Sequence, residues 1–288
     1  MGAWGAGIYQ NDYAADLKST ISLVVKIPGD NIDLLNVLKE MHPESEDSKD
    51  EEWTTFWLVV ADQFEKRGIL CDEITAQANN IITSGEDLRR LQELNMSQGE
   101  LNKRYKLLEA LLNRLKSPST PKDRKIPKNP PSFCLDVGDV YAFQTQNGAA
   151  VNAWFSSWEE AGFKPNGWGA LIVVDRGRAF DWLPLVAIAS TTVDYEVMPT
   201  IEDVKNSSLM LHPQTRGAAK CVPKKSHIKR MKMEYLGSLK LNLAKAKNIV
   251  SKWSDTQAID FGWSISSASF SSNLRRGLPD GGKVCDIL

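Results

Sequence analysis

Basic side chains dominate the segment between residues 216 and 252 of this 288-residue sequence. Eleven Lys or Arg residues stand there against a single acidic residue, Glu234. Ammonium and guanidinium groups in such a row can bind the phosphates of a nucleic acid or the carboxylates of an acidic protein. A face that meets only water, or the acidic half of the chain, is the alternative. The strongest candidates for binding are Arg216, Lys220, Lys224, Lys225, Lys229, Arg230 and Lys232.

A second group of candidates mixes aromatic and guanidinium side chains between residues 154 and 182. Buried aromatic and arginine side chains carry most of the affinity of protein interfaces, so exposed members of this group would anchor a partner. Ordinary packing in the core is the alternative for each tryptophan. The candidate anchors are Trp154, Phe155, Trp158, Trp168, Arg176, Arg178 and Trp182.

Sequence motifs of catalysis are absent. The chain contains no G-x-x-x-x-G-K-[ST], no G-x-S-x-G and no H-E-x-x-H. Its three histidines, His42, His212 and His227, and its four cysteines are scattered and match no zinc-ligand spacing. We therefore expect a protein that is not an enzyme and that has no cofactor and no metal site. An unrecognised enzyme with a site between two domains is the alternative.

The segment from Gly2 to Asp16 is rich in glycine and aromatic residues. Glycines permit positive φ angles and close backbone approach, and Asn11 or Asp12 can cap a following helix. The segment is either a cap packed against helices or a second binding surface. The candidate residues for such a surface are Trp4, Asn11, Asp12 and Asp16.

Length and composition indicate an ordinary globular protein of two domains. The chain is 42% hydrophobic and 25% charged. It has no apolar run of the roughly 20 residues that a membrane helix needs, and no secretory signal. We expect a cytoplasmic protein with free thiols. Residues 285–288 match a prenylation pattern on Cys285, so membrane attachment is expected only if that cysteine is modified.

Charge is divided unequally along the chain. Residues 1–120 carry 13 Lys or Arg against 20 Asp or Glu, a net −7, and residues 121–288 carry 22 against 16, a net +6. This division indicates either two units that attract each other or a basic half that meets an acidic partner.

Apolar residues at helical spacing predict a helical domain over residues 1–116. We expect Asn11 or Asp12, Asp30 or Asn31, and Ser84 to precede or cap helices, and a helix from Trp53 to end near Gly68. Residues 117–132 contain five prolines and almost nothing apolar, which is the composition of a linker.

The pattern after the linker predicts a β-rich domain over residues 133–250, followed by a tail over 251–288. Asn147-Gly148 is a strong hairpin signal. Further strands are expected over 170–174, 183–192 and 235–241, and helices over 156–161, 201–206 and 242–253.

The N-terminal half resembles a known family. Residues 2–7 read GAWGAG, and Asn11, Asp12 and Asp16 follow. This pattern resembles the opening G-x-W-G-x-G-x-F-x-N-D-x-A-x-D of a bacterial family called domain of unknown function 4259, with Tyr9 in place of phenylalanine. The helices up to residue 116 are similar to the helical body of that family. The family has no assigned activity, so the resemblance implies a fold and no particular chemistry.

The C-terminal half resembles a second family. Residues 137–143 read VGDVYAF and are similar to the G-D-[VI]-[FY]-x-[IF] opening strand of the immunity protein 26 family of polymorphic toxin systems. Residues 235–239, YLGSL, resemble the closing strand of that family, whereas residues 154–168 depart from its pattern. The resemblance implies a small SH3-like barrel and a cytosolic protein that neutralises a toxin by tight binding.

The sequence thus predicts an α+β protein, with a helical N-terminal domain and a C-terminal domain that is an SH3-like or other small barrel. The expected function is binding without catalysis in bacterial conflict, as an immunity protein or as a component of an antiviral defence complex that blocks a protein partner. Binding of nucleic acid by residues 216–252 is the alternative from another class.

Overall fold

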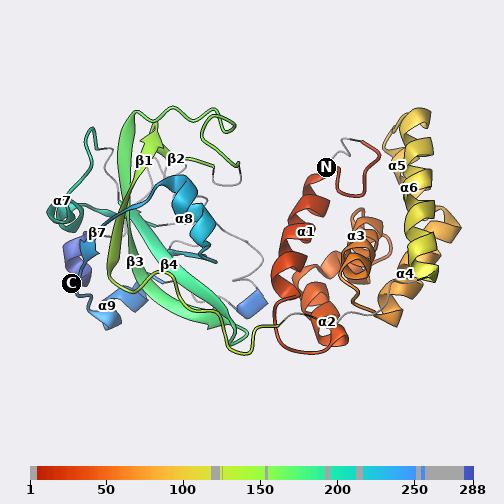
Figure 1. The fold of residues 1–288 in the computed structure, drawn as a ribbon, viewed down its shortest axis with the longest axis horizontal. Coiled ribbons are helices and arrows are strands. Elements are labelled where there is room, and N and C mark those ends of the chain that lie inside the picture. Colours follow the sequence, from red (N-terminus) through yellow and green to blue (C-terminus); the bar gives the residue numbers. More distant parts are fainter. Residues whose placement is uncertain are drawn as a thin grey trace. The chain divides into compact units, whose positions relative to one another are not determined.

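A computed structural model of the chain separates into two compact units, Met1–Lys128 and Asn129–Leu288. Helices build the first unit and an antiparallel sheet builds the second, so the α+β prediction is confirmed (Figure 1). The division between the units falls inside the expected linker, residues 117–132. The structure describes residues 5–117, 124, 126–152, 155–191, 195–211, 217–250, 254–256 and 282–288.

Helix α3 is the centre of the N-terminal unit. Its residues from Trp53 to Phe64 are all buried, so this helix needs other helices on nearly every side. Contacts from α1, α4, α5 and α6 supply this cover, and Figure 1 shows α3 end-on among them. The elements of the unit are α1 (Asp12–Val24), α2 (Asn31–Met41), η1 (Pro43–Glu46), α3 (Trp53–Lys66), α4 (Asp72–Ser84), α5 (Glu86–Glu93) and α6 (Gln98–Lys116).

Side-chain caps define the first two helices as expected. The Asn11 side chain accepts a hydrogen bond from the α1 backbone, and Asp30 forms a capping box with Asp33 at the start of α2. The expected cap at Ser84 is wrong, because Ser84 is the last residue of α4. The turn to α5 is made by Gly85, whose left-handed φ of 71° suits glycine.

The C-terminal unit contains a seven-stranded antiparallel sheet in its described residues, with the path β2-β1-β3-β4-β5. Strand β7 shares one edge of β1 with β2, and β6 pairs with β4 beside β5. Among these described pairings, neither β2 nor β7 at one edge of the sheet is bonded to β5 or β6 at the other. The elements are β1 (Asp139–Gln146), β2 (Ala149–Ala150), β3 (Gly167–Ala179), β4 (Leu183–Thr191), α7 (Ile201–Asn206), β5 (Leu209–Met210), β6 (Ala219–Cys221), α8 (Lys225–Met231), β7 (Glu234–Ser238), α9 (Leu243–Asn248) and η3 (Val284–Ile287).

Both faces of the sheet are buried, which explains why β4 is apolar from Leu183 to Ala189. Leu171 and Val173 of β3 belong to one core with Met231 of α8. Ile172 lies between them in the strand and belongs to the other core, together with Val284 of η3. Figure 1 shows α8 beside the long strands β3 and β4.

Two turns require the residues that occupy them. Asn147 and Gly148 have φ angles of 51° and 80°, so the predicted hairpin between β1 and β2 is confirmed. Gly138 precedes β1 with a φ of 93°, and a Cβ atom there would lie 2.3 Å from the carbonyl oxygen of Leu239. The glycine of the GDVYAF segment is therefore needed for the approach of the chain that follows β7.

Part of the expected tail belongs to the sheet unit. Val284 and Ile287 are buried in the second core, and the Asn242 amide donates to the Ile287 carbonyl at 2.8 Å. Residues 257–281 of the expected tail lie outside the described residues. The expected helix over 156–161 is wrong, because these residues form bends and turns there, whereas the helix over 201–206 is confirmed as α7.

Candidate functional site

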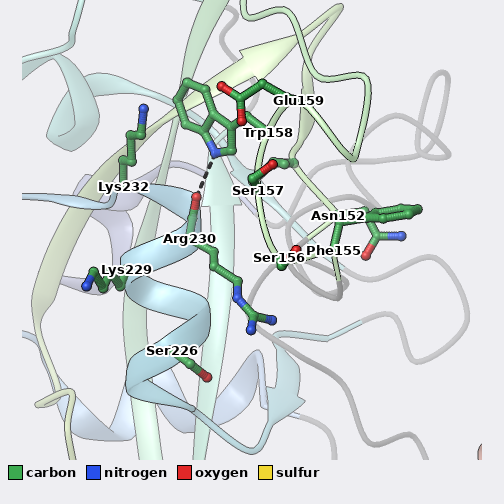
Figure 2. Close-up of a pocket in the computed structure, with 11 residues that line it drawn as sticks. Asn152, Phe155, Ser156, Ser157, Trp158, Glu159, Ser226, Lys229, Arg230 and Lys232 are labelled. Atoms are coloured by element: carbon green, nitrogen blue, oxygen red, sulfur yellow. Dashed lines mark hydrogen bonds between the residues drawn. The ribbon is translucent and has the colours of Figure 1, made fainter.

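A groove of about 440 Å³ lies on the C-terminal unit between the segment after β2 and helix α8. It brings together residues from the two candidate sets that lie about 70 positions apart in the sequence (Figure 2). Its described lining consists of Val151, Asn152, Phe155, Ser156, Ser157, Trp158, Glu159, Ser226, Lys229, Arg230 and Lys232.

Trp158 fixes one wall of this groove against the other. Its indole Nε1 donates to the carbonyl oxygen of Arg230 at 2.7 Å, and its ring meets Phe163 edge-on with centroids 5.1 Å apart. The Lys232 ammonium lies 3.7 Å from the centroid of the indole ring, in cation–π geometry. Trp158 is therefore a rigid, half-buried support, and Phe155, with 41% of its surface exposed, is the accessible aromatic of the pair.

Helix α8 presents its cations to solvent because its apolar face is committed to the core. Met231 packs into the first core, and His227 is also buried. Lys225, Lys229 and the capping residue Lys232 follow at i, i+4 and i+7, so they share one exposed face. Seven residues of rise at 1.5 Å each place the first and last of them about 10 Å apart along the helix.

Arg230 and Ser226 lie one turn apart on the side of α8 that faces the loop. Figure 2 shows the Arg230 side chain extending into the space between α8 and the hydroxyl groups of Ser156 and Ser157. The Ser156 hydroxyl donates to Glu160, so the wall that Arg230 faces carries a carboxylate of this chain.

Glu159 and Glu160 keep this wall acidic at one end of the groove. Hydrogen bonds from the hydroxyl and amide of Ser156, with the charge of Arg230, lower the pKa of Glu160. Hydrogen bonds from its own amide and from Ser157 lower the pKa of Glu159, and the charge of Lys232 adds to them. Both carboxylates are thus ionised at neutral pH.

Burial lowers the pKa of His227 to about 4, and the charges of Lys224 and Arg230 act in the same direction. The imidazole is therefore neutral at physiological pH and lies under the helix, outside the residues that line the groove. The other histidine that could have joined a catalytic site, His212, lies outside the described residues.

The remaining members of the aromatic set lie elsewhere. Trp168 pairs with Tyr195 near the start of β3, about 26 Å from Arg176 at 3.3 Å per residue. Arg176 and Arg178 stack on Phe133, with guanidinium carbons 4.9 and 4.5 Å from the ring centroid. These residues therefore do not join the groove.

Arg178 serves the fold. Its Nη1 donates to the carbonyl oxygens of Pro131 and Trp182 at 2.9 and 2.8 Å. These bonds hold the end of the linker against the turn between β3 and β4. Trp154 lies outside the described residues.

The basic candidates also divide into residues that line the groove and residues that lie elsewhere. Lys220 is half-buried on β6, and Lys224 caps α8 outside the groove lining. Arg216 lies outside the described residues.

One described member of the expected second surface at the N-terminus has a structural role. Asn11 caps α1, accepting from the Ala14 amide at 2.5 Å. Asp12 and Asp16 are exposed on that helix, and partial desolvation by the neighbouring chain raises the pKa of Asp16, with the charge of Asp12 adding to the effect. Trp4 lies outside the described residues.

Polar contacts from two helices, α6 and α3, hold the N-terminal segment in place. Its Ala6 amide donates to Glu100 at 3.0 Å, and Arg104 donates to the Ala6 carbonyl at 3.4 Å. Tyr9 donates to the buried carboxylate of Asp62 on α3. These contacts favour the interpretation of this segment as a cap packed on the helices.

We did not predict from the sequence those groove residues whose side chains are neither aromatic nor basic. Ser156 and Ser157 stand between two predicted anchors, and Ser226 lies within the basic segment, so their positions were the available signal. Val151 and Asn152 had no such signal, because their place in the groove depends on the path of the chain after β2.

Comparison with known proteins assigns no family. No family model matches the chain, and neither a curated protein nor a solved structure matches it. In the described residues, no three His, Cys, Asp or Glu side chains are grouped to hold a metal ion. No helix among those residues has the length and apolar character needed to cross a membrane.

Proposed function

We propose that this chain is a non-catalytic binding protein that recognises a partner protein through the groove between residues 151–159 and α8. The observation that supports this is the meeting of an exposed aromatic, Phe155, with a cationic helix face and the guanidinium of Arg230. Aromatic and arginine side chains beside a concave surface are the combination that supplies binding energy in protein interfaces.

The biological setting that we propose is bacterial conflict, in the cytoplasm. It comes from the resemblance of residues 137–143 and 235–239 to immunity proteins, and the cationic groove is compatible with it. The chain would act as an immunity protein or as a subunit of a defence complex. Its mechanism would be steric and electrostatic blockade of an acidic site on the partner.

Nucleic acid is the second candidate partner. The exposed face formed by Lys225, Lys229 and Lys232 favours it, since a row of cations can follow a phosphate backbone. Two features weigh against it. The row spans only about 10 Å, and Glu159 stands at one end of the groove.

Capture of the partner from a host lysate tests the proposal. The tagged protein is used with and without nuclease, beside an Arg230→Glu variant and a Lys247→Glu control on the exposed surface of α9. We expect one stoichiometric protein that survives nuclease, is lost with Arg230→Glu and is kept with Lys247→Glu. Loss of every protein after nuclease, or capture that ignores Arg230, contradicts the proposed function.

A further inference from the structure

We infer that the edge of β5 and the apolar face beside it form a peptide-binding site, which the segment Gly282–Leu288 of this chain occupies as an intramolecular ligand. The peptides that fit this edge site are extended, end in one helical turn and carry aliphatic residues three positions apart. The edge site is separate from the groove of the proposed function, because it lies on the face of the sheet opposite α8.

Backbone hydrogen bonds join the segment to the edge of the sheet. The Leu209 amide donates to the Gly282 carbonyl at 2.7 Å. The Val284 amide donates to the Ser207 carbonyl at 2.9 Å, and the two stretches form an antiparallel bridge. Leu209 belongs to β5, which pairs with β4. The segment therefore extends the sheet beyond β5, in the manner in which an added strand binds to the edge of a domain.

Two aliphatic side chains anchor the segment to the core. Val284 and Ile287 stand three positions apart and are 0% and 4% exposed. Both lie in the core that includes Val204 of α7, and Figure 1 shows the turn η3 between α7 and α9. The Ile287 carbonyl also accepts a hydrogen bond from the Asn242 amide at 2.8 Å. A peptide without aliphatic side chains at these two positions would leave part of this core open to water.

The turn of the segment is formed by its own hydrogen bonds. The Asp286 carboxylate accepts from the Lys283 amide at 2.7 Å, and the Asp286 amide donates to the Lys283 carbonyl at 3.0 Å. Both side chains are exposed, so they leave recognition to the backbone and to the aliphatic anchors. A peptide that forms its own turn loses less conformational freedom when it docks.

The segment is separable from the rest of the unit. Among the described residues, this core has eleven buried members, and nine of them lie outside the segment. Residues 257–281 connect the segment to Thr256, and a chain of that length can span up to about 80 Å. The covalent connection therefore does not fix the segment on the edge, and its contacts do.

An intramolecular ligand closes the edge site in the isolated protein. A segment of the same chain is present at a high effective concentration, so it excludes a free peptide of equal affinity. A partner gains access when its own peptide binds more tightly or when the segment is displaced.

Cleavage of the chain ahead of the segment provides the test. A sequence for a site-specific protease is inserted between residues 268 and 269 of the full chain, outside the described residues. The probe is a labelled peptide, Gly-Lys-Val-Ser-Asp-Ile-Leu, with serine in place of Cys285, and its binding is followed by fluorescence anisotropy. We expect the probe to bind the cleaved chain at least about tenfold more tightly than the uncleaved chain, because cleavage removes the advantage of the intramolecular ligand.

Matched changes assign the contacts. Asp in place of Ile in the probe should weaken its binding at least about tenfold, and so should methylation of the Val amide, which removes the donor to Ser207. Gln in place of the exposed Lys should stay within about twofold. In the uncleaved chain, Ile287→Asp should open the edge site and tighten binding of the probe about tenfold, whereas Cys285→Ser should leave it unchanged.

Three results overturn the inference. The first is equal binding of the probe to the cleaved and uncleaved chains, and the second is equal binding of the Ile and Asp peptides. The third is loss of the circular dichroism of the sheet when the cleaved segment is released, which would make the segment an indispensable part of the core. If Ile287→Asp does not fold, the cleaved chain still decides between these outcomes.

The groove and the edge site are tested independently. Arg230→Glu should bind the probe within about twofold of the wild type, because Arg230 lies on the side of the sheet that α8 covers. Failure of lysate capture therefore leaves the edge site standing, and failure of the probe to bind leaves the proposed function standing.

Discussion

At the scale of single residues, a buried ion pair holds the helical unit together. Arg104 of α6 and Asp87 of α5 are 5% and 0% exposed, and form two hydrogen bonds of 2.8 and 2.9 Å. Arg104 also donates to the Ala6 carbonyl, so the pair joins two helices and the N-terminal segment. A charge that is left unpaired in such a place is costly, because water cannot reach it.

Asp87→Asn should therefore destabilise this unit by about 3–5 kcal/mol, measured by urea unfolding. Glu109→Gln, an exposed change on α6, is the matched control and should cost less than about 0.5 kcal/mol. Replacement of both partners by apolar residues, Asp87→Leu with Arg104→Met, should recover part of the loss. A small effect of Asp87→Asn would show that the pair is not needed for packing.

The buried imidazole of His227 makes the sheet unit sensitive to acid. Its pKa lies near 4 in the folded chain and near 6.5 in the unfolded chain, so the unfolded state binds more protons between these values. The contribution of His227 to the free energy of unfolding should be fully present above pH 6.5. It should be lost as the pH drops toward 4, which lowers stability by roughly 1–3 kcal/mol. The difference between wild type and His227→Gln, followed by urea unfolding at several pH values, isolates the effect. Parallel curves for the two proteins would contradict it.

At the scale of elements, the segment Gly282–Leu288 completes the second face of the sheet. Three backbone hydrogen bonds hold it: Leu209 donates to the Gly282 carbonyl at 2.7 Å, Val284 to Ser207 at 2.9 Å, and Asn242 to Ile287 at 2.8 Å. Its side chains Val284 and Ile287 enter the same core as α7. Processing after prenylation of Cys285 would remove Ile287 from this core, which argues against that modification.

Ile287→Ala should cost about 2–5 kcal/mol, since the core around it cannot fully close on the missing atoms. Cys285→Ser changes the exposed neighbour on the same turn and should stay within about 0.5 kcal/mol. Chemical denaturation of the full chain measures both. A cost below about 0.5 kcal/mol for Ile287→Ala would mean that this segment does not contribute to the core.

At the scale of the whole molecule, each unit has a core of its own. Division at Lys128 assigns 17 basic and 21 acidic residues to the first unit, and 18 basic and 15 acidic residues to the second. The units therefore carry net charges of −4 and +3, a weaker contrast than the division at residue 120 gave. Because the second unit as a whole is only weakly basic, the concentration of cations on α8 is local to that helix.

Because each unit buries its own apolar residues, calorimetry of the full chain should show two unfolding transitions. Asp87→Asn should lower the midpoint of one transition, and Ile287→Ala should lower that of the other, by several degrees each. A single transition that both variants shift equally would show that the units unfold as one.

Local interactions explain what could be predicted from the sequence. The caps at Asn11 and Asp30, the apolar helix from Trp53 and the Asn147-Gly148 hairpin depend on neighbours along the chain, so composition and spacing define them. The change of pattern at residues 117–132 is also local, and the division after Lys128 falls within that range.

Contacts between distant segments decided the candidate site. The sequence alone determined that residues 216–252 are basic and that aromatic residues cluster near 155–158, because residue type and spacing are local properties. Only the tertiary structure placed Trp158 on the Arg230 carbonyl, separated Arg178 from the groove and buried Ile287, because each depends on which strands pair and which faces pack.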